Sequence, residues 1–384
     1  MALLLGFAFL LPISISLSEP LVFLAAPVWL VVLARHRGAR CLSCPYRWPI
    51  AAFLAVAVLS IPWSFRPEMS LQRGHRLPVF LIPFMMLTAF RPDARGGWAL
   101  AVRTVTLFVA GCALRGFYDV ARVAVLVHRG AGLYSTGNMR DPQMYMVALS
   151  FLVALVMAAG AKARTASVWT AMAACAAGLV LHFKRGCWMA FVAAAAAMAG
   201  MARRWVSLAA VVLCVAALLL VPQVRERVGM LRDESSSRLG GRYVLWSRVA
   251  PGMLKDYPNG MGWGAVRYGD LREYSWRVQP GLDHLHNNAL QIALELGWAG
   301  LAIWLWWMGT AFVAMYQAWR RLPAGEPAGG LALGTFGGFL ALMVNGVVEY
   351  NFGDSEILML ICFLMGLSCV LREKARLAGD GAAP

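Results

Sequence analysis

Long apolar runs separated by short polar segments dominate the chain, and this pattern predicts an all-α polytopic membrane protein. A transmembrane helix needs about 20 predominantly apolar residues. About twelve runs approach this length, at residues 2–17, 20–34, 49–64, 77–90, 98–117, 142–160, 166–182, 187–201, 205–222, 287–317, 328–348 and 355–371. The tenth run is too long for one straight crossing, so we expect its first part to end in a turn or bend near Gly297 and Gly300.

The ends of these runs suggest a division of the chain into three parts. Residues 2–17 lack a preceding basic region and a small-residue cleavage site, so we expect a retained first helix. We therefore predict transmembrane helices 1–9 in residues 1–222, and helices 10–12 with a cytoplasmic tail in residues 287–384. Between them, residues 223–286 form the only extramembrane segment large enough to have structure, and we predict a loop with amphipathic helices there.

A polar stripe marks the start of the tenth run. Asn287, Gln291 and Glu295 recur four apart and therefore share one helix face. Polar groups on a helix that leads into a membrane are costly, which indicates a partner or a function. His286 stands where the helix begins, and backbone N–H groups there favour anions. A capped helix start with a solvated stripe accounts for the same residues equally well.

The long loop contains a second helical pattern, from residue 238 to residue 255. One face of this helix is apolar, formed by Trp246, Val249, Ala250, Met253 and Leu254. Arg238, Arg242 and Trp246 lie four apart, so Arg242 can project from the edge of that face. A helix on the membrane surface with Arg242 directed inward fits this pattern, and a solvated arginine fits it equally well.

Composition and charge support the membrane assignment. Of the 384 residues, 60% are hydrophobic and only 14% are charged, which excludes an ordinary soluble domain. The formal net charge of +16 mostly reports topology here, because the basic residues lie between apolar runs. The polar segments expected on the same face of the membrane as the N-terminus have a net charge of +12. Those expected on the opposite face have a net charge of +4. This bias predicts that both termini are cytoplasmic.

Three residues from separate segments are expected on the outer face, namely Arg185, Arg242 and His286. Guanidinium groups bind a diphosphate through paired hydrogen bonds, and a histidine can accept a proton from an attacking hydroxyl. Lys184 lies beside Arg185 in a short turn. This set fits glycosyl transfer from a lipid-linked diphosphate sugar. No paired aspartates or dense carboxylate cluster indicates a metal site, and no cofactor is expected.

The stretch HLHNNALQIALELGWAGL resembles the HN-x-x-LQ-x-x-x-E-x-G-x-x-GL signature of the O-antigen ligase and polymerase superfamily. Three further segments are similar to that family: GGRYVLWSRVAPGMLKDYPNGMGWG, with an arginine–tryptophan helix and a glycine turn; FKRGCWMA; and VVEYNFGDSEILML. The matched positions are His286, Asn287, Leu290, Gln291, Glu295, Gly297, Gly300, Leu301, Arg242, Trp246, Pro258, Gly262, Gly264 and Arg185.

The resemblance implies a membrane glycosyltransferase of GT-C-like architecture with a large periplasmic loop. In the ligase branch, a glycan on undecaprenyl diphosphate moves to a hydroxyl of the lipid A–core in the bacterial inner membrane, as a step of lipopolysaccharide biosynthesis. The resemblance also implies that His286 is the general base and that Arg185 and Arg242 bind the donor diphosphate. Further substrate-binding candidates are Lys184, Arg238, Trp246, His284, Asn287 and Gln291.

Three other functions remain open from the sequence. An O-antigen polymerase would join two lipid-linked glycans, but such proteins tend to have two sizeable outer loops, and the second candidate here, residues 118–141, is short. A protein O-oligosaccharyltransferase is a further enzyme alternative. A transporter of lipid-linked glycans would be expected to carry charges or broken helices at mid-membrane, and no Lys or Arg clearly lies there.

Overall fold

The computed structural model describes residues 1–35, 43–91, 96–130, 138–160, 165–229, 241–278, 282–323 and 325–380. Within these ranges the regular elements are helices, and none is a strand. The elements are α1 (Ala2–Leu10), α2 (Ile15–Arg35), α3 (Arg47–Leu59), α4 (Pro67–Gln72), the 3₁₀-helix η2 (Arg73–Leu81), α5 (Ile82–Ala89), α6 (Gly97–His128), α7 (Arg140–Ala159), α8 (Ala166–Leu181), α9 (Arg185–Met201), α10 (Trp205–Leu219), α11 (Pro222–Gly229), α13 (Arg242–Val244), the π-helical turn η6 (Leu245–Val249), α14 (Ala250–Asp256), α15 (Tyr268–Tyr274), α16 (Asn288–Arg321), α17 (Pro327–Asn345) and α18 (Ser355–Asp380).

Six of the described helices are long and apolar enough to cross a membrane: α2, α6, α7, α16, α17 and α18. Shorter apolar helices, α3, α8 and α9, accompany them. These lengths and compositions agree with a polytopic membrane protein. The number of twelve crossings stays a prediction.

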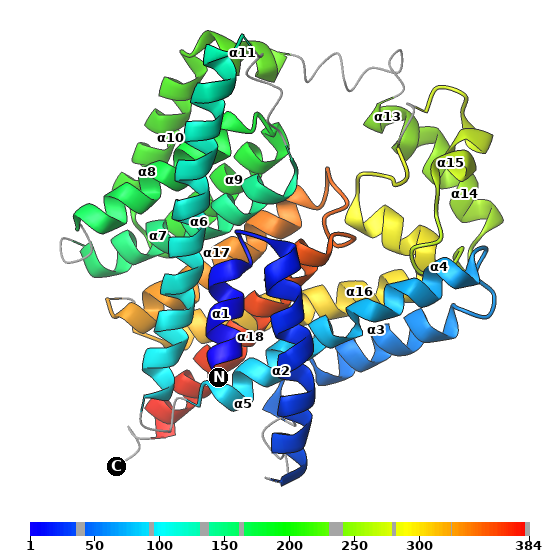
Figure 1. The fold of residues 1–384 in the computed structure, drawn as a ribbon. Helices are drawn as coiled ribbons and strands as arrows, with labels where there is room; N and C mark the ends of the chain where they lie inside the picture. Colours follow the sequence, from blue (N-terminus) through cyan, green and yellow to red (C-terminus); the bar gives the residue numbers. More distant parts are fainter. Residues whose placement is uncertain are drawn as a thin grey trace.

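Helix α18 forms the centre of the bundle. In its apolar stretch 89% of the residues are buried, against 22% for α2, which lies at the periphery. Around α18 pack α5, α16, α17 and η2 (Figure 1). Other extensive contacts join α17 to α7 and α9, α8 to α6 and α7, and α1 to α2 and α6. An apolar stretch this completely buried faces other helices and contributes little lipid-facing surface.

Glycines let α17 approach α7 closely. A Cβ on Gly330 would lie 2.8 Å from the Cβ of Ala158, and one on Gly334 would lie 2.7 Å from the ring of Phe151. These positions are four residues apart and share a face, the small-residue pattern that brings membrane helices together. The contacts also show that α17 and α7 run antiparallel, because the start of α17 meets the end of α7.

Two predicted boundaries are wrong. The first run does not form one helix, since α1 ends at Leu10 and α2 begins only at Ile15, with Pro12 in the turn between them. The fifth run is longer than expected, because α6 continues to His128 through residues assigned to a loop. Apolar side chains from Val120 to Val127 maintain the helix beyond the stretch that hydropathy alone selected.

The long loop folds as a small helical layer beside the bundle (Figure 1). Elements α13, η6, α14 and α15 surround their own buried cluster, which includes Leu245, Val249, Met253 and Leu271. Of the predicted apolar face, Val249, Ala250, Met253 and Leu254 are buried within this cluster and Trp246 is half-buried, so the face packs against protein. The π-helical turn lies directly before Pro251, whose ring nitrogen cannot donate a hydrogen bond.

Helix α16 breaks at Gly297, which confirms the predicted bend. Its φ of 70° and ψ of −175° are not helical, and a side chain there would meet the backbone of Asn259 at 2.6 Å. The break frees the carbonyls of Leu294 and Glu295, and these accept hydrogen bonds from the backbone N–H groups of Met261 and Gly262. The glycine turn of the long loop is thereby fixed to the first part of α16.

Candidate functional site

Several of the predicted site residues contact one loop, residues 346–354, which lies between α17 and α18. Gly346 accepts a hydrogen bond from the backbone N–H of Asn288, and Val347 accepts one from the side chain of Asn287. Val348 accepts one from the Nε of Arg242 at 2.8 Å. Because the loop joins the ends of two tightly packed helices, its position is determined by the bundle core.

His286 lies at the entrance of α16, with one ring nitrogen paired. Its Nδ1 is 2.9 Å from Oε1 of Glu349. Within the part of the chain that the structure describes, no group bonds to Nε2. A neutral imidazole that donates from Nδ1 to a carboxylate presents a lone pair on Nε2, the form required of a general base. The backbone of His286 has a φ of 49°, a strained conformation that is often found at functional sites.

Glu349 is shared by two histidines. Its Oε1 also lies 3.2 Å from Nε2 of His284, whose Nδ1 lies 2.8 Å from Asp283. Burial alone would lower the pKa of His284, but its hydrogen bonds to Asp283 and Glu349 raise that pKa to about 9. Burial would raise the pKa of Glu349, but the hydrogen bonds from both histidines hold it well below its usual range. Near neutral pH a charged His284 therefore balances a charged Glu349.

Arg242 approaches the same carboxylate. Its Nη2 is 3.6 Å from Oε2 of Glu349, and its Nε is bound to the backbone of Val348. The side chain is 38% exposed, so its guanidinium can still reach a ligand. Of the three core residues from the sequence, the structure thus brings Arg242 and His286 onto one carboxylate.

Lys184 and Arg185 lie in the short turn between α8 and α9, as the sequence predicts. Arg185 is buried at the first position of α9. The next residue, Gly186, packs against the loop at the end of α17, because a Cβ there would lie 3.0 Å from both Asn345 and Val348. Val348 is therefore in contact with the Arg185 turn on one side and with Arg242 on the other.

Two of the three residues of the polar stripe, Gln291 and Glu295, are buried, while Asn287 at the helix start is half-buried. Asn287 caps the helix by accepting a hydrogen bond from the N–H of Leu290 at 2.9 Å. Gln291 accepts one from the N–H of Leu285 and donates one to Glu295. Both Gln291 and Glu295 are 1% exposed. These side chains position the histidine segment and are occupied by hydrogen bonds within the protein.

The indole of Trp246 has a similar structural role. Its Nε1 donates to the carbonyl of Leu285 at 2.7 Å, between the two histidines of the site. The helix of the long loop is thereby attached to the residue that precedes His286. The candidate Arg238 lies outside the described residues.

A polar cavity of about 250 Å³ opens beside His284 and Glu349, and His286, which pairs with Glu349, lies outside its lining. His284 and Glu349 form one wall, and Arg73, Arg267 and Asp354 are among the other lining residues. Burial raises the pKa of Asp354 to about 6, and the nearby Glu356 and Glu349 add to this shift. The cavity therefore presents both donors and acceptors of hydrogen bonds.

The donor atoms of His284, His286 and Glu349 all lie within 4.8 Å of one another. Two imidazoles and a carboxylate have the chemistry to bind a transition metal. In the described geometry, however, the same carboxylate oxygen already pairs with both imidazoles. A second such group, Asp119, Asp141 and His182, is buried and is paired with Arg115 and Tyr145.

Glu349 and Asn288 belong to the site, although no pattern in the sequence predicts a role for either of them. Asn288 donates to Asn351 at 2.6 Å and accepts from the N–H of Phe352, so it fastens α16 to the loop before α18. Both Glu349 and Asn351 lie in the VVEYNFGD segment, which had been noted for its family resemblance. The sequence signal that could have identified Glu349 is an acidic residue among apolar ones, directly beside a predicted membrane span.

A comparison with known families agrees with this arrangement. The helical bundle and the polar cluster at the end of α17 define a membrane protein with a candidate site at the bundle end. The O-antigen ligase family model matches residues 149–305, which include Arg185, Arg242 and His286. This match confirms the resemblance to the O-antigen ligase and polymerase superfamily, whose members are membrane glycosyltransferase-like enzymes. No curated protein matches the chain.

Proposed function

We propose that the protein is an O-antigen ligase, which transfers a glycan from undecaprenyl diphosphate to a hydroxyl of the lipid A–core at the periplasmic face of the inner membrane. The observation that carries this proposal is the His286–Glu349 pair with Arg242 beside it. A base and a cationic group next to each other are what an attack on a diphosphate-linked sugar requires.

In the proposed reaction, Nε2 of His286 accepts the proton of the acceptor hydroxyl. The oxygen attacks the anomeric carbon of the donor sugar, and the bond from that carbon to the diphosphate oxygen breaks. The diphosphate leaves with the electron pair, and Arg242 and Arg185 stabilise its charge. Glu349 orients the imidazole and stabilises its protonated form. His284 neutralises Glu349, so the site keeps a net positive charge for the diphosphate.

We place the acceptor sugar in the 250 Å³ cavity, and the diphosphate on the side of Arg242 and the Arg185 turn. A sugar has hydroxyls that both donate and accept hydrogen bonds, and the mixture of Arg267, Asp354 and His284 in the cavity suits such a ligand. The proposed reaction needs no metal, because the arginines supply the positive charge at the leaving group.

The test uses the purified full-length protein with an undecaprenyl-linked glycan and lipid A–core, with and without a chelator. We expect intact glycan on the core in both cases, and its loss with His286→Ala but not with His128→Ala, an exposed histidine at the end of α6. Growth of the lipid-linked glycan without a core acceptor would instead identify a polymerase. Loss of activity in the chelator would contradict the metal-independent reaction.

A further inference from the structure

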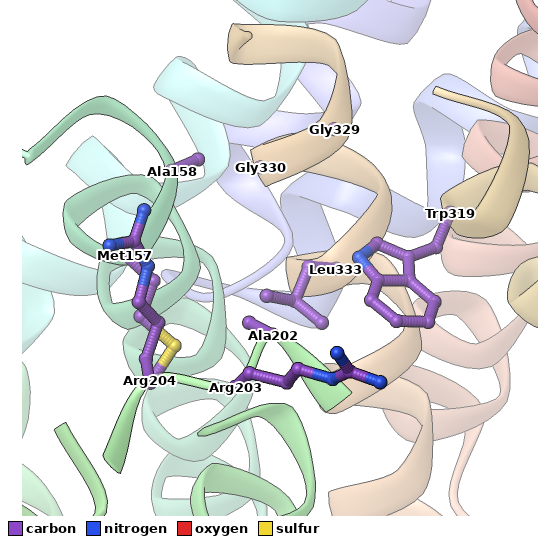
Figure 2. Close-up of a pocket in the computed structure, with 9 residues that line it drawn as sticks. All are labelled: Met157, Ala158, Ala202, Arg203, Arg204, Trp319, Gly329, Gly330 and Leu333. Atoms are coloured by element: carbon purple, nitrogen blue, oxygen red, sulfur yellow. The ribbon is translucent and has the colours of Figure 1, made fainter. Parts of the chain in front are cut away.

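A second cavity lies at the other end of the bundle, and its walls are partly cationic and partly apolar. It has a volume of about 140 Å³ and is formed where α7, α9 and α16 end and α17 begins. Its apolar wall consists of Met157, Ala158, Ala202, Leu333 and the ring of Trp319. Arg203 and Arg204 lie in its lining beside the glycines of the first turn of α17 (Figure 2).

The two arginines are available to a ligand. Figure 2 shows Arg203 extending across the cavity toward Trp319, while Arg204 lies beside Met157. Both residues are exposed, and no carboxylate pairs with either of them within the described ranges. The two guanidinium groups lie on opposite sides of the cavity in Figure 2 and have no acidic partners in these ranges, so each can pair with a phosphate group at the cavity.

The position of the cavity is one membrane thickness away from the candidate active site. Helix α17 begins at the cavity and ends at the loop that holds Glu349, and its 19 residues span about 28 Å. Helix α9 runs in the opposite direction, from Arg185 to the cavity, over a similar length. The hydrocarbon core of a bilayer is about 30 Å thick, so the cavity lies at the membrane face opposite the site.

The surroundings of the arginine pair are suited to lipid rather than to water. Trp205 and Val206 follow directly and are 67% and 85% exposed. Exposed tryptophans beside basic residues are typical of the level of lipid headgroups. A ligand with one phosphate and acyl chains would place the phosphate at Arg203, which extends across the cavity, with Arg204 adding positive charge at the opposite wall and the apolar part along Leu333 and the neighbouring helix surface.

We propose that this cavity binds the phosphate of an anionic phospholipid in the leaflet opposite the active site. The proposal rests on the cavity, the arginine pair and the exposed apolar flank, and does not depend on which reaction the site performs. With the proposed topology, that leaflet is the cytoplasmic one.

The test compares lipid retention by native mass spectrometry of the full-length protein in detergent. The probes are phosphatidylglycerol and phosphatidylethanolamine with the same acyl chains. We expect phosphatidylglycerol to be retained in preference, and Arg203→Gln/Arg204→Gln to weaken its retention roughly tenfold, as the loss of charge-assisted hydrogen bonds predicts. The matched control is Arg320→Gln/Arg321→Gln, which removes the same charge from the end of α16, where neither arginine is part of the cavity lining.

A second variant separates the cavity from general surface charge. Ala202→Phe fills the cavity and keeps both arginines, so we expect it to lower retention as well. The proposal would be overturned if the cavity arginine variant and the α16 control variant lost phosphatidylglycerol equally. Unchanged retention in Ala202→Phe would overturn it as well. Displacement of the lipid by inorganic phosphate would identify a site for free anions and would overturn it too.

Discussion

His286 is oriented by a carboxylate that lies 63 residues further along the chain. The same carboxylate binds His284 and approaches Arg242, so a single side chain connects the loop before α16 to the first turn of α13. In this arrangement the proposed proton acceptor, the carboxylate that orients it and the neighbouring arginine are held by separate elements. A change at Glu349 is therefore expected to affect the histidine more than the binding of the donor.

Glu349→Gln tests this orientation. The amide keeps the shape of the side chain but removes the charge that stabilises a protonated imidazole. We expect kcat to fall on the order of a hundredfold or more, with the KM for the donor changed by less than about threefold. Steady-state kinetics on the reconstituted protein measures both. Glu373→Gln, at the exposed end of α18, is the control, and an equal loss there would contradict the role of Glu349.

The paired histidine gives stability a dependence on pH. The pKa of His284 is about 9 in the folded protein, above its value of about 6.5 in an unfolded chain. Its pairing therefore stabilises the fold fully below about pH 6.5, and this stabilisation is lost as the pH rises through about 9. We expect the Tm difference between wild type and His284→Gln to shrink from about pH 6.5 to about pH 10. A difference that stays constant over this range would rule out the pairing.

His286, Arg185 and Arg242 could be selected from the sequence because their residue types and their family motif both indicate chemistry. Gln291 and Trp246 are predicted to bind substrate, and this stays a prediction. Both side chains form a hydrogen bond to the backbone of Leu285, and Gln291 also lines the cavity beside His284. Spacing places a polar side chain on a helix face and does not reveal whether that face meets water, a ligand or another segment. For the same reason, Glu349 could not be paired with His286, since only the tertiary fold brings them together.

At the scale of single elements, the break in α16 determines how the long loop is attached to the bundle. Two glycines in a long apolar run were sufficient to predict it. The break leaves two carbonyls of α16 free to accept hydrogen bonds from the glycine turn at residues 260–262. These bonds were not predictable, because they join segments more than thirty residues apart. The continuation of α6 to His128 and the π-helical turn before Pro251 likewise depend on packing that periodicity does not report.

Gly297→Ala is expected to destabilise the protein by about 1–3 kcal/mol, because a side chain at this positive φ is strained and meets the backbone of Asn259. The matched control is Gly309→Ala in the same helix, where nothing lies within 4 Å of the added Cβ. Thermal unfolding in detergent, followed by circular dichroism, compares the two. Similar midpoints for both variants would contradict the strained break.

For the whole molecule, the apolar runs correctly indicated a membrane protein that is helical throughout its described regular elements, while two of their boundaries were wrong. Hydropathy identifies segments that avoid water, and it does not distinguish a helix that faces lipid from one that is enclosed by protein. Helix α18, which is almost entirely buried, and α2, which is mostly exposed, look alike by composition. The central position of α18 required the structure.

The proposed orientation can be measured with single cysteines. We expect Trp276→Cys, at an exposed position of the long loop, to react with a membrane-impermeant maleimide in intact spheroplasts. Arg376→Cys, near the end of α18, should react only after the membrane is opened. Both variants are made with Cys41 and Cys214 replaced by serine, and the other cysteines are buried. The reverse pattern would invert the topology and place the histidine cluster in the cytoplasm.

The conformation of the short loop that contains Glu349 is restrained at both ends, because the loop connects α17 to the buried helix α18. A detergent that loosens the bundle by even a small slip of these two helices will separate the acid from the imidazole while every helix remains formed. Inactivation after solubilisation should therefore come before any loss of helical signal, and return to a bilayer should reverse it. We therefore expect the proposed activity to depend on how tightly α17 and α18 stay packed in the bilayer.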